Sequence, residues 1–447
     1  MPENLAAHLA AQQEPLKTAL VELVRIPSVC DEGGGGYPFG EAIDQSLRKA
    51  LQIAGNLGFK TQYGDGGYYG FAQIGEGAEM LGILGHLDVV PPGDLEDWDH
   101  DPFDPVEIDG LLYGRGTQDD KGPMLAAMFA VKALMDAGVT FNKRVRFIFG
   151  LDEETLWRSI KPYIEKEELP GMGFSPDSRF PVTFAEKGLL ELRLEGSNAS
   201  RVRLTGGSAF NEVPDMAFYD GEWQDDLASK LDELGFEYER KEKGIEVKGE
   251  AAHAMVPEEG INAIARLCIA LQAIDIESKA INFVVQEIGE DPNATRIFGK
   301  CADEPSGKLT FNVGKVDLGE VEQLSIDCRI PVTVPKEEIV SKLSAVAARY
   351  GLEYKEFDWL APLYLPLDHF MIQALMKVYR QYSGDTVTEP RSSGGATYAR
   401  AISNCVAFGA LIFDEPLTEH EPNERAVLKN LYKAMEIYAH AVFELTR

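Results

Sequence analysis

Apolar residues in the first third of the chain recur with two different periods. Residues 3–25 and 38–57 have the spacing of amphipathic helices. Two short, mostly apolar runs, Leu81–Leu84 and Arg144–Leu151, are typical of buried strands. Between these runs, residues 120–137 are rich in Ala and Met and predict a helix. A strand, a helix and a strand in this order indicate a βαβ unit whose parallel sheet is covered on both faces.

The pattern changes after Phe184. Residues 188–204 and 244–248 alternate between apolar and polar positions, as strands with one exposed face do. Residues 260–273 and 335–350 have helical spacing. This central part of the chain therefore predicts an α+β region that differs from the part before it.

The length of the chain favours more than one domain, because 447 residues exceed what one ordinary core supports. We expect an α/β fold in which residues 1–182 and 363–447 form a main domain with a mostly parallel sheet between helices. Residues 183–362 are expected to form an inserted α+β domain.

The charge balance excludes one large class of partner. The chain has 43 Lys and Arg against 73 Asp and Glu, which gives a formal net charge of −30. Binding to nucleic acid depends on basic groups that neutralise phosphates, so no nucleic-acid partner is expected. No run of 18 apolar residues occurs, so no membrane span is expected either.

The cysteines and the first residues point to one compartment. Five widely spaced cysteines, an odd number, are typical of reduced thiols; they are Cys30, Cys268, Cys301, Cys328 and Cys405. The opening Met-Pro-Glu-Asn-Leu lacks a basic segment followed by an apolar stretch. We therefore expect free cysteines and a cytoplasmic location.

Side chains that bind metals occur in five short segments punctuated by Gly or Pro. The segments are Gly-His-Leu-Asp at His86–Asp88, Gly-Thr-Gln-Asp-Asp-Lys-Gly around Asp119, Asp-Glu-Glu at Asp152–Glu154, Pro-Asp-Ser at Asp177 and Thr-Glu-His-Glu at His420. Two His and several carboxylates form a ligand set that suits a pair of divalent ions. Ligands of parallel sheets bind at the carboxyl ends of the strands, where several of these segments lie. Together they predict a two-metal hydrolase.

Each candidate alone also has an ordinary structural explanation. Asp119 precedes a helix and suits an N-cap, and Asp177 suits a turn. Glu153 and Glu154 could be solvated loop residues, and His420 a surface histidine. Only the whole set favours a metal site over these alternatives.

His86 and Asp88 are two residues apart at a strand end, so both side chains lie on one face. A metal-bound imidazole usually donates its second N–H to a carboxylate, and Asp88 is placed to accept it. The alternative is a histidine that caps a buried strand.

Two other segments carry less information. The acidic run Leu95–Asp109 is expected to be a solvated loop over the site, and Gly33–Gly36 a flexible loop without the Lys-Ser/Thr of a phosphate loop.

Taken together, these segments resemble the aminoacylase/carboxypeptidase superfamily of two-zinc metallopeptidases. The closest likeness is to its bacterial dipeptidase V branch, which is related to the carnosinases. The segments that carry the resemblance are "GHLDVVPPG", "GRGTQDDKGP", "DEE", "PDS", "AHAMVPEEGINA" at Ala252–Ala263 and "GGATYARA" at Gly394–Ala401. They occur in the order of the family, and the resemblance covers nearly the whole chain.

The resemblance implies a role for each metal-type residue. His86 and Asp177 would hold one metal, Glu154 and His420 the other, and Asp119 would bridge the two. Glu153 would be the general base, and Asp88 the carboxylate that orients His86. The metals would be zinc, with Mn²⁺ or Co²⁺ as alternatives that the same ligands accept. In this family the peptide bond after the bridging Asp, here Asp119–Asp120, is often cis.

The resemblance also makes the main domain a catalytic domain and the inserted domain a lid. By the segments "FNEVPD", "AHAMVPE" and "IDCRIPV", the lid would contribute Asn211, His253 and Arg329 to substrate binding. Arg329, helped by backbone N–H groups at Gly394 and Gly395, would clamp the substrate carboxylate. The chain departs from many relatives at Ala396, because they have Gly-Gly-Thr-Asp-Ala in this segment.

The charges of the predicted ligands agree with this chemistry. Two divalent ions bring four positive charges, and the carboxylates of Asp119, Glu154 and Asp177 neutralise three. The remaining charge favours a bridging hydroxide, since metal-bound water can reach a pKa of about 7. Glu153 would take a proton from that water and pass it to the leaving amine. His253 would polarise the peptide carbonyl.

The expected function is therefore that of a metal-dependent dipeptidase or aminopeptidase acting on dipeptides and other short peptides. One alternative keeps the chemistry and hydrolyses N-acyl amino acids, and another is a non-catalytic peptide-binding protein. The size of the insertion predicts a monomer, because dimeric members of the superfamily have an insertion of roughly half this length.

Overall fold

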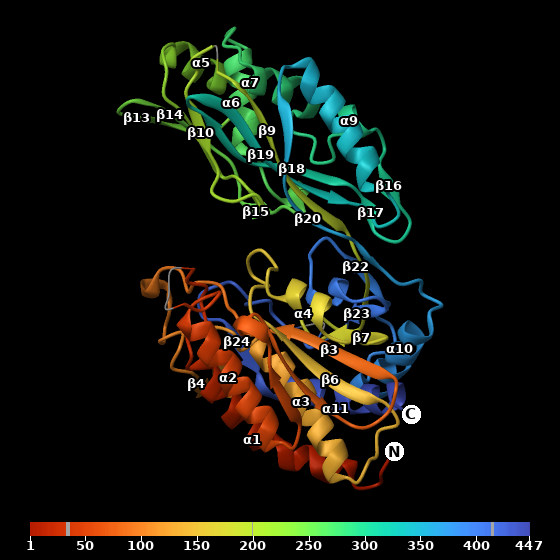
Figure 1. The fold of residues 1–447 in the computed structure, drawn as a ribbon. Helices are drawn as coiled ribbons and strands as arrows, with labels where there is room; N and C mark the ends of the chain where they lie inside the picture. The colour runs from red at the N-terminus through yellow and green to blue at the C-terminus, as the bar shows by residue number, and fades with distance from the viewer. Residues whose placement is uncertain (33–35, 199, 413–414) are drawn as a thin grey trace. The chain divides into compact units, whose positions relative to one another are not determined.

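The computed structural model describes residues 1–32, 36–198, 200–412 and 415–447, and the chain divides into two compact units. Unit 1 consists of Met1–Phe184, Leu363–Arg391 and Thr397–Arg447. Unit 2 consists of Ala185–Pro362 and Ser392–Ala396. The predicted glycine loop at Gly33–Gly36 lies largely outside the described residues. Figure 1 labels the elements of both units.

The main sheet of unit 1 has a parallel centre and antiparallel edges. Its order is β1 (Lys60–Tyr63), β2 (Gly70–Ile74), β6 (Arg144–Gly150), β3 (Met80–His86), β7 (Met172–Ser175), β23 (Cys405–Ala407), β8 (Thr183–Glu186) and β21 (Leu363–Tyr364). Strand β3 pairs in parallel with both β6 and β7, and Ile83 faces Phe147 on one side and Phe174 on the other. Every residue of β3 is buried, as its apolar run predicts. Its carboxyl end at His86 is thereby held between two neighbouring strands.

Helices cover this sheet on opposite sides, with α4 on one and α3 on the other (Figure 1). The helices of unit 1 are α1 (Leu5–Val24), α2 (Glu41–Asn56), α3 (Lys121–Asp136), α4 (Ile160–Lys166), α10 (Phe370–Ser383) and α11 (Leu428–Leu445). Helix α3 contacts α1 and α11 as well as β3, so it is buried nearly all round. Its Ala- and Met-rich composition suits that position. The predicted α/β class, with a mostly parallel sheet between helices, is confirmed.

The acidic run Leu95–Asp109 is not wholly a loop, contrary to the prediction. It contains a short 3₁₀ turn at Leu95–Asp97 and strand β4 (Val106–Ile108). Strand β4 forms a three-stranded sheet with β5 (Leu111–Tyr113) and β24 (Arg425–Val427). Asp109 and Gly110 join β4 to β5 with positive φ angles of 52° and 80°. An Asp-Gly pair between short apolar strands is a strong hairpin signal, and this was the signal in the sequence.

Unit 2 is built on one antiparallel sheet. Its order is β13 (Tyr238–Lys241), β14 (Gly244–Lys248), β12 (Met216–Tyr219), β10 (Leu204–Gly206), β18 (Thr310–Leu318), β19 (Val321–Ile330), β9 (Gly188–Ser197) and β20 (Glu353–Leu360). In β9 the leucines at 190, 192 and 194 are buried, whereas Glu191, Arg193 and Glu195 are only half-buried. The alternating pattern therefore places one face of the sheet on the core. The predicted strand 188–204 is in fact β9 followed by the start of β10.

The helices of unit 2 pack their apolar side chains into one core with these strands. They are α5 (Gln224–Leu234), α6 (Ala263–Gln272), α7 (Lys279–Phe283), α8 (Thr295–Phe298) and α9 (Lys336–Arg349), and a π-helical turn covers Val284–Ile288. Smaller pieces of unit 2 are the ribbons β11 (Glu212–Val213) with β15 (Ala252–His253) and β16 (Ala302–Asp303) with β17 (Gly307–Lys308), and a 3₁₀ turn at Pro257–Glu259. Strand β22 (Arg391–Ser393) pairs with β8, and unit 1 has further 3₁₀ turns at Asp65–Gly67 and Tyr398–Ala401. The predicted α+β character of unit 2 is observed.

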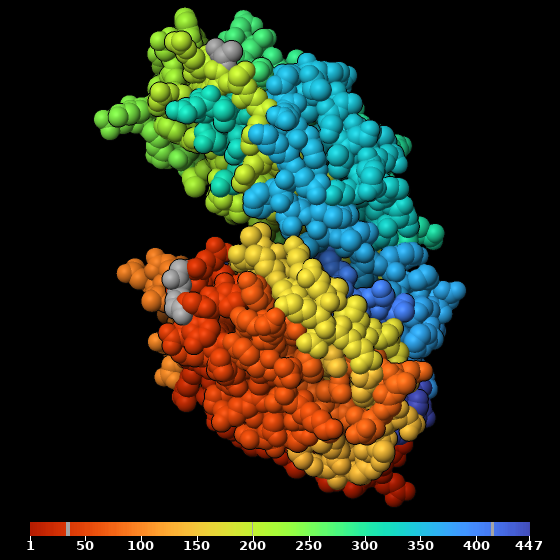
Figure 2. Space-filling model, in the orientation of Figure 1, coloured from red at the N-terminus to blue at the C-terminus, as the bar shows by residue number. Residues whose placement is uncertain are grey.

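Three further observations concern the surface, the cysteines and the hydropathy of the helices. On the side of unit 1 seen in Figure 2, the N-terminal segments, coloured red to orange, make up most of the surface. All five cysteines are free, as predicted. Within the described part of the chain, no helix combines the length and the apolar character that a membrane crossing requires.

Candidate metal centre

The predicted metal residues of unit 1 lie where neighbouring parallel strands end. His86 is the last residue of β3, Glu153 and Glu154 follow β6, and Asp177 follows β7. Because β6, β3 and β7 are adjacent and parallel, their carboxyl ends meet at one edge of the sheet. Asp119 stands just before α3, close to the same edge by its contact with His86.

Asp119 lies between the two histidines. Its Oδ1 is 2.9 Å from Nε2 of His86, and its Oδ2 is 3.1 Å from Nε2 of His420. Each carboxylate oxygen thus faces a different imidazole. A carboxylate in this position can bind one cation with each oxygen.

The other candidates surround this trio. Among the described residues, His86, Glu153 and Asp177 bring potential ligand atoms within 4.8 Å of one another, and so do His86, Asp119 and Glu154. His420 joins the second group, since its Nε2 is 3.1 Å from Oε2 of Glu154. Two imidazoles among this many carboxylates form a mixed nitrogen and oxygen set that fits a pair of divalent cations.

Asp88 supports the centre in two ways. Nδ1 of His86 lies 2.9 Å from the backbone oxygen of Asp88 and 3.5 Å from its carboxylate Oδ1. Oδ2 of Asp88 accepts a hydrogen bond of 3.1 Å from the backbone N–H of Glu154. The backbone carbonyl, rather than the carboxylate alone, is therefore closest to the imidazole, and the carboxylate also holds the loop of Glu154.

The charges of the centre shift its pKa values strongly. Burial lowers the pKa of His86, but the carboxylates of Asp119 and Asp88 outweigh it and raise that pKa well above the usual value. For His420, burial is likewise outweighed by Asp119 and Glu154, and the pKa is raised to about 11. Burial raises the pKa of Glu153 well above its usual range, against the charge of His86 and together with that of Asp177. The site therefore stabilises positive charge, as a cation site should.

The peptide bond between Asp119 and Asp120 is cis, as the family resemblance implies. Asp120 is fully buried, and its Oδ2 accepts a hydrogen bond of 3.2 Å from the backbone N–H of His86. Gly85 leaves room for this carboxylate, because a Cβ at that position would lie 2.1 Å from Oδ2 of Asp120.

Sequence reasoning missed two residues that tie the ligand loops together, Gln118 and Glu424. Both side chains bind the backbone of the opposite loop, and Glu424 is almost completely buried. The sequence offers one signal, since the tight Gly-Arg-Gly-Thr-Gln-Asp turn leaves backbone N–H groups that need acceptors. No local pattern says that the acceptor lies some 300 residues away.

The predicted substrate residues all lie in unit 2. The ribbon of β11 and β15 brings Asn211 and His253 together, because Glu212 pairs with His253 and the N–H of Ala254 donates to the backbone oxygen of Asn211 at 2.8 Å. Nδ1 of His253 accepts a hydrogen bond of 3.0 Å from the backbone N–H of Met255. With Nδ1 as the acceptor, a neutral imidazole carries its proton on Nε2 and can donate it.

Arg329 is buried, with 3% of its surface exposed. Its guanidinium donates to both carboxylate oxygens of Asp327, at 2.7 and 2.6 Å, and to the backbone oxygen of Gly394 at 2.9 Å. The N–H of Gly395 donates to Oγ of Ser393 at 2.9 Å. The structure therefore links Arg329 to the predicted glycine turn, while Asp327 already binds part of its guanidinium.

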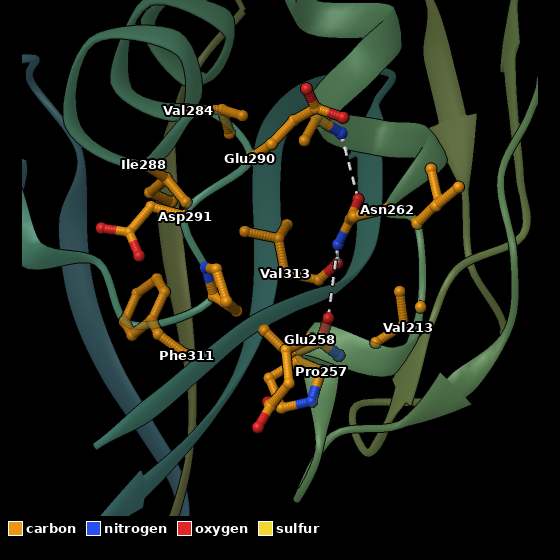
Figure 3. A pocket seen from close by; sticks show the side chains of 16 residues that line it. Val213, Pro257, Glu258, Asn262, Val284, Ile288, Glu290, Asp291, Phe311 and Val313 are labelled. Atoms are coloured by element: carbon orange, nitrogen blue, oxygen red, sulfur yellow. Dashed lines mark hydrogen bonds between the residues drawn. The ribbon is translucent and has the colours of Figure 1, made fainter. Parts of the chain in front are cut away.

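A cavity of about 230 Å³ lies beside the ribbon formed by β11 and β15 (Figure 3). Apolar side chains such as Val213, Phe311 and Val313 line it, together with Glu258. Asn262 caps α6 at its edge by accepting from the N–H of Ala265, and its amide donates to the backbone oxygen of Val313.

Comparisons with known proteins identify the family of the chain. The sequence pattern of the family described as "Peptidase family M20/M25/M40" matches residues 82–444. The chain is 35% identical over 469 residues to "Putative dipeptidase YtjP" of Bacillus subtilis, covering 99% of this chain and 100% of that protein.

Two solved structures share the fold. One is the dipeptidase Dug1p from Saccharomyces cerevisiae, with a TM-score of 0.64 and 14% identity, covering 100% of this chain and 99% of that one. The other is the M20 family metallo-carboxypeptidase Sso-CP2 from Sulfolobus solfataricus, with a TM-score of 0.60 and 19% identity, covering 96% and 98%.

Proposed function

The chain belongs to peptidase family M20/M25/M40 and is a metal-dependent peptidase, and from this premise we propose that it is a two-metal dipeptidase. The observation that carries the proposal is Asp119, whose two carboxylate oxygens face His86 and His420. A carboxylate with one oxygen toward each of two imidazoles suits a pair of neighbouring divalent ions.

In this proposal His86 and Asp177 hold one ion, Glu154 and His420 hold the other, and Asp119 is shared. The ions are zinc, with Mn²⁺ or Co²⁺ as substitutes of similar ligand preference. When bound, they would lower the pKa of a water molecule and polarise the peptide carbonyl.

Glu153 is proposed as the general base. It lies with His86 and Asp177 in one cluster, and burial raises the pKa of its carboxyl. A carboxylate of raised pKa accepts a proton from water more readily than an ordinary glutamate does. It can then donate that proton to the amine that leaves when the peptide bond breaks.

The lid residues are proposed to bind the substrate. His253, with its Nδ1 engaged by the N–H of Met255, would donate from Nε2 to the peptide carbonyl oxygen, and Asn211 lies on the same ribbon. Arg329 and the turn at Gly394 and Gly395 would bind the free carboxylate of a short peptide. Support for this last role is the direct bond between Arg329 and Gly394, although Asp327 shares the guanidinium.

A hydrolysis screen with Zn²⁺, Mn²⁺ or Co²⁺ added tests the proposal. The substrates are dipeptides, tripeptides, dipeptides amidated at the C-terminus, and N-acetyl and N-succinyl amino acids. Free dipeptides should be cleaved fastest, and amidation should cost more activity than lengthening a side chain. Faster cleavage of acyl amino acids would make the protein a deacylase instead, and no cleavage of any substrate would contradict both functions.

A further inference from the structure

Two loops far apart in the sequence carry two of the proposed metal ligands. The bridging loop, residues 114–119, ends at Asp119. The C-terminal loop, residues 415–424, contains His420. Both belong to unit 1, and about 300 residues separate them.

Glu424 reaches from the C-terminal loop to the backbone of the bridging loop. Its carboxylate accepts from the N–H groups of Gly116 at 3.0 Å, Gln118 at 2.9 Å and Asp119 at 3.2 Å. It also accepts a hydrogen bond of 2.8 Å from Nη1 of Arg115. The side chain of Glu424 is 1% exposed, so these bonds form out of contact with water.

Gln118 makes the reciprocal connection. Its Oε1 accepts from the backbone N–H groups of Thr418 at 2.7 Å and Glu419 at 2.9 Å. Its Nε2 donates to the backbone oxygen of Pro416 at 3.1 Å. Gln118 and Glu424 therefore connect the two loops in both directions, and Nη1 of Arg115 adds a hydrogen bond of 3.3 Å to the backbone oxygen of Glu421.

The hydrogen bonds of Gln118 and Glu424 hold the two proposed ligand loops by their backbones. Glu424 bonds the N–H of Asp119 itself, and Gln118 bonds the N–H of Glu419, the residue before His420. Such outer contacts orient ligands and usually affect metal affinity when they are lost. The flanking strands β5 and β24 pair where the two loops meet, through Tyr113 and Arg425, but the segments that carry Asp119 and His420 lie beyond that pairing.

We propose that Gln118 and Glu424 are positioning residues that set the distance between Asp119 and His420 and thereby hold the second metal position together. The inference rests on the proposed two-metal function. It predicts a selective effect. The second position depends on Asp119, Glu154 and His420, two of which lie on the two loops. The first position also has His86, at the end of β3, and Asp177, after β7, which lie outside the two loops.

Titration of the metal-free protein with Co²⁺, followed by visible absorption and calorimetry, tests the proposal without measuring activity. The wild type should bind two equivalents. In Gln118→Ala and Glu424→Gln the second equivalent should bind about 10- to 100-fold more weakly, the usual effect of losing an outer partner. The first equivalent should change much less. The double variant should be little worse than Glu424→Gln alone, because both side chains serve the same connection.

A buried carboxylate elsewhere in unit 1 provides the control. Asp44 is 4% exposed, accepts a hydrogen bond of 2.7 Å from Nε of Arg48 and another from the hydroxyl of Tyr63. Asp44→Asn should lower the melting temperature and leave both Co²⁺ affinities unchanged.

The outcomes separate the two proposals. A wild type that binds fewer than two equivalents contradicts the two-metal function itself. A wild type with two equivalents, and Gln118→Ala and Glu424→Gln variants whose second affinity matches it, overturns the positioning role. So does a loss of second-site affinity in Asp44→Asn, since that would trace the effect to general stability. If Glu424→Gln does not fold, the Gln118→Ala variant alone tests the positioning role, because that substitution leaves no buried charge without its partner.

Discussion

At the residue scale, the adjacent carboxylates of Glu153 and Glu154 have to be assigned as metal ligand or general base. Glu154 is 3.1 Å from His420, whereas Glu153 groups with His86 and Asp177. Glu154 therefore suits a ligand, and Glu153 suits a base that touches water. Glu153→Gln should retain two bound metals and lose at least about 10²-fold in kcat, the lower range for acid–base catalysis.

Elemental analysis and steady-state kinetics on the same sample check this prediction. Glu154→Gln is the matched control, because it changes the neighbouring carboxylate in the same way and should instead lower the metal content. Near-normal turnover in Glu153→Gln would move the base to another residue.

His420 is a proposed ligand that the sequence alone makes an ordinary surface histidine. Its side chain is 52% exposed and its φ is +65°, as in a surface turn. Only its contacts with Asp119 and Glu154 distinguish it from an ordinary surface histidine. His420→Ala should lower the metal content from two equivalents to about one, measured by elemental analysis. His253→Ala, which changes a lid residue, should keep both, and an unchanged content in His420→Ala would remove His420 from the ligand set.

At the scale of elements, the sequence predicted the strands and helices that carry the site. The predicted helix 120–137 is α3, Lys121–Asp136, and the apolar run Leu81–Leu84 is the centre of β3. These segments are predictable because one buried environment dictates their composition. The hairpin at Asp109 and Gly110 was predictable from its turn residues and was missed.

Close packing between α3 and β3 gives a prediction at this scale. A Cβ on Gly85 would meet Oδ2 of Asp120 at 2.1 Å and Cγ of Met124 at 2.4 Å. Gly85→Ala should therefore destabilise the protein by about 1–3 kcal/mol or more, as overpacking of a core does. Gly55→Ala is the control, since Gly55 lies inside α2 and a Cβ there meets nothing within 4 Å.

In that control the added methyl group should stabilise the protein by about 0.5–1 kcal/mol, the helical preference of Ala over Gly. Urea unfolding of both variants measures the two effects. Equal stability of the two variants would mean that α3 can move away from β3 without cost.

Helix α11 carries a histidine that should make stability depend on pH. His440 is 8% exposed, stacks on Tyr382, and its Nδ1 has no hydrogen-bond partner among the described residues. Burial lowers the pKa of His440 to about 4, opposed by Glu436 and assisted by the N-terminus and Lys433. The folded state thus binds fewer protons than the unfolded state between about pH 4 and 6.5.

The stability that neutral His440 provides is therefore complete above pH 6.5 and is lost as the pH falls toward 4. Between pH 7 and pH 5 the free energy of unfolding should fall by about 2 kcal/mol more in the wild type than in His440→Phe, which keeps the stacked ring. Urea unfolding at both pH values measures this difference. Parallel losses in the two proteins would show that His440 titrates normally.

At the scale of the whole molecule, the site separates into what a sequence can and cannot reveal. Ligands such as His86 and Asp119 were predictable, because their chemistry restricts the residue type and each stands beside a strand or helix end. The partnership of Gln118 with the loop of Glu419 was not, because a hydrogen bond to backbone leaves no mark on the sequence of its partner. The pairing of Arg329 with Asp327, two residues away on β19, could have been predicted from the strand period but was not.

The last prediction concerns the number of chains that make one active site. Unit 2 is built on one continuous eight-stranded sheet, in which β10 pairs with β18. Under the proposed function, an insertion of this size would supply His253 and Asn211 from the same chain rather than from a second subunit. The formal charge of −30 also opposes close self-association unless apolar contacts outweigh it. We therefore expect a monomer.

Mixing two inactive variants distinguishes a monomer from a shared site. His253→Ala removes the proposed carbonyl donor and Glu153→Gln the proposed base, so each variant alone should lose most of its activity. If every site uses one chain, the mixture stays as inactive as its components at any ratio. If sites are shared between chains, some mixed sites contain both an intact His253 and an intact Glu153, and activity returns. Mixing should follow refolding from urea so that subunits can exchange, with light scattering to give the mass. Recovered activity, or a mass of two chains, would contradict the monomer.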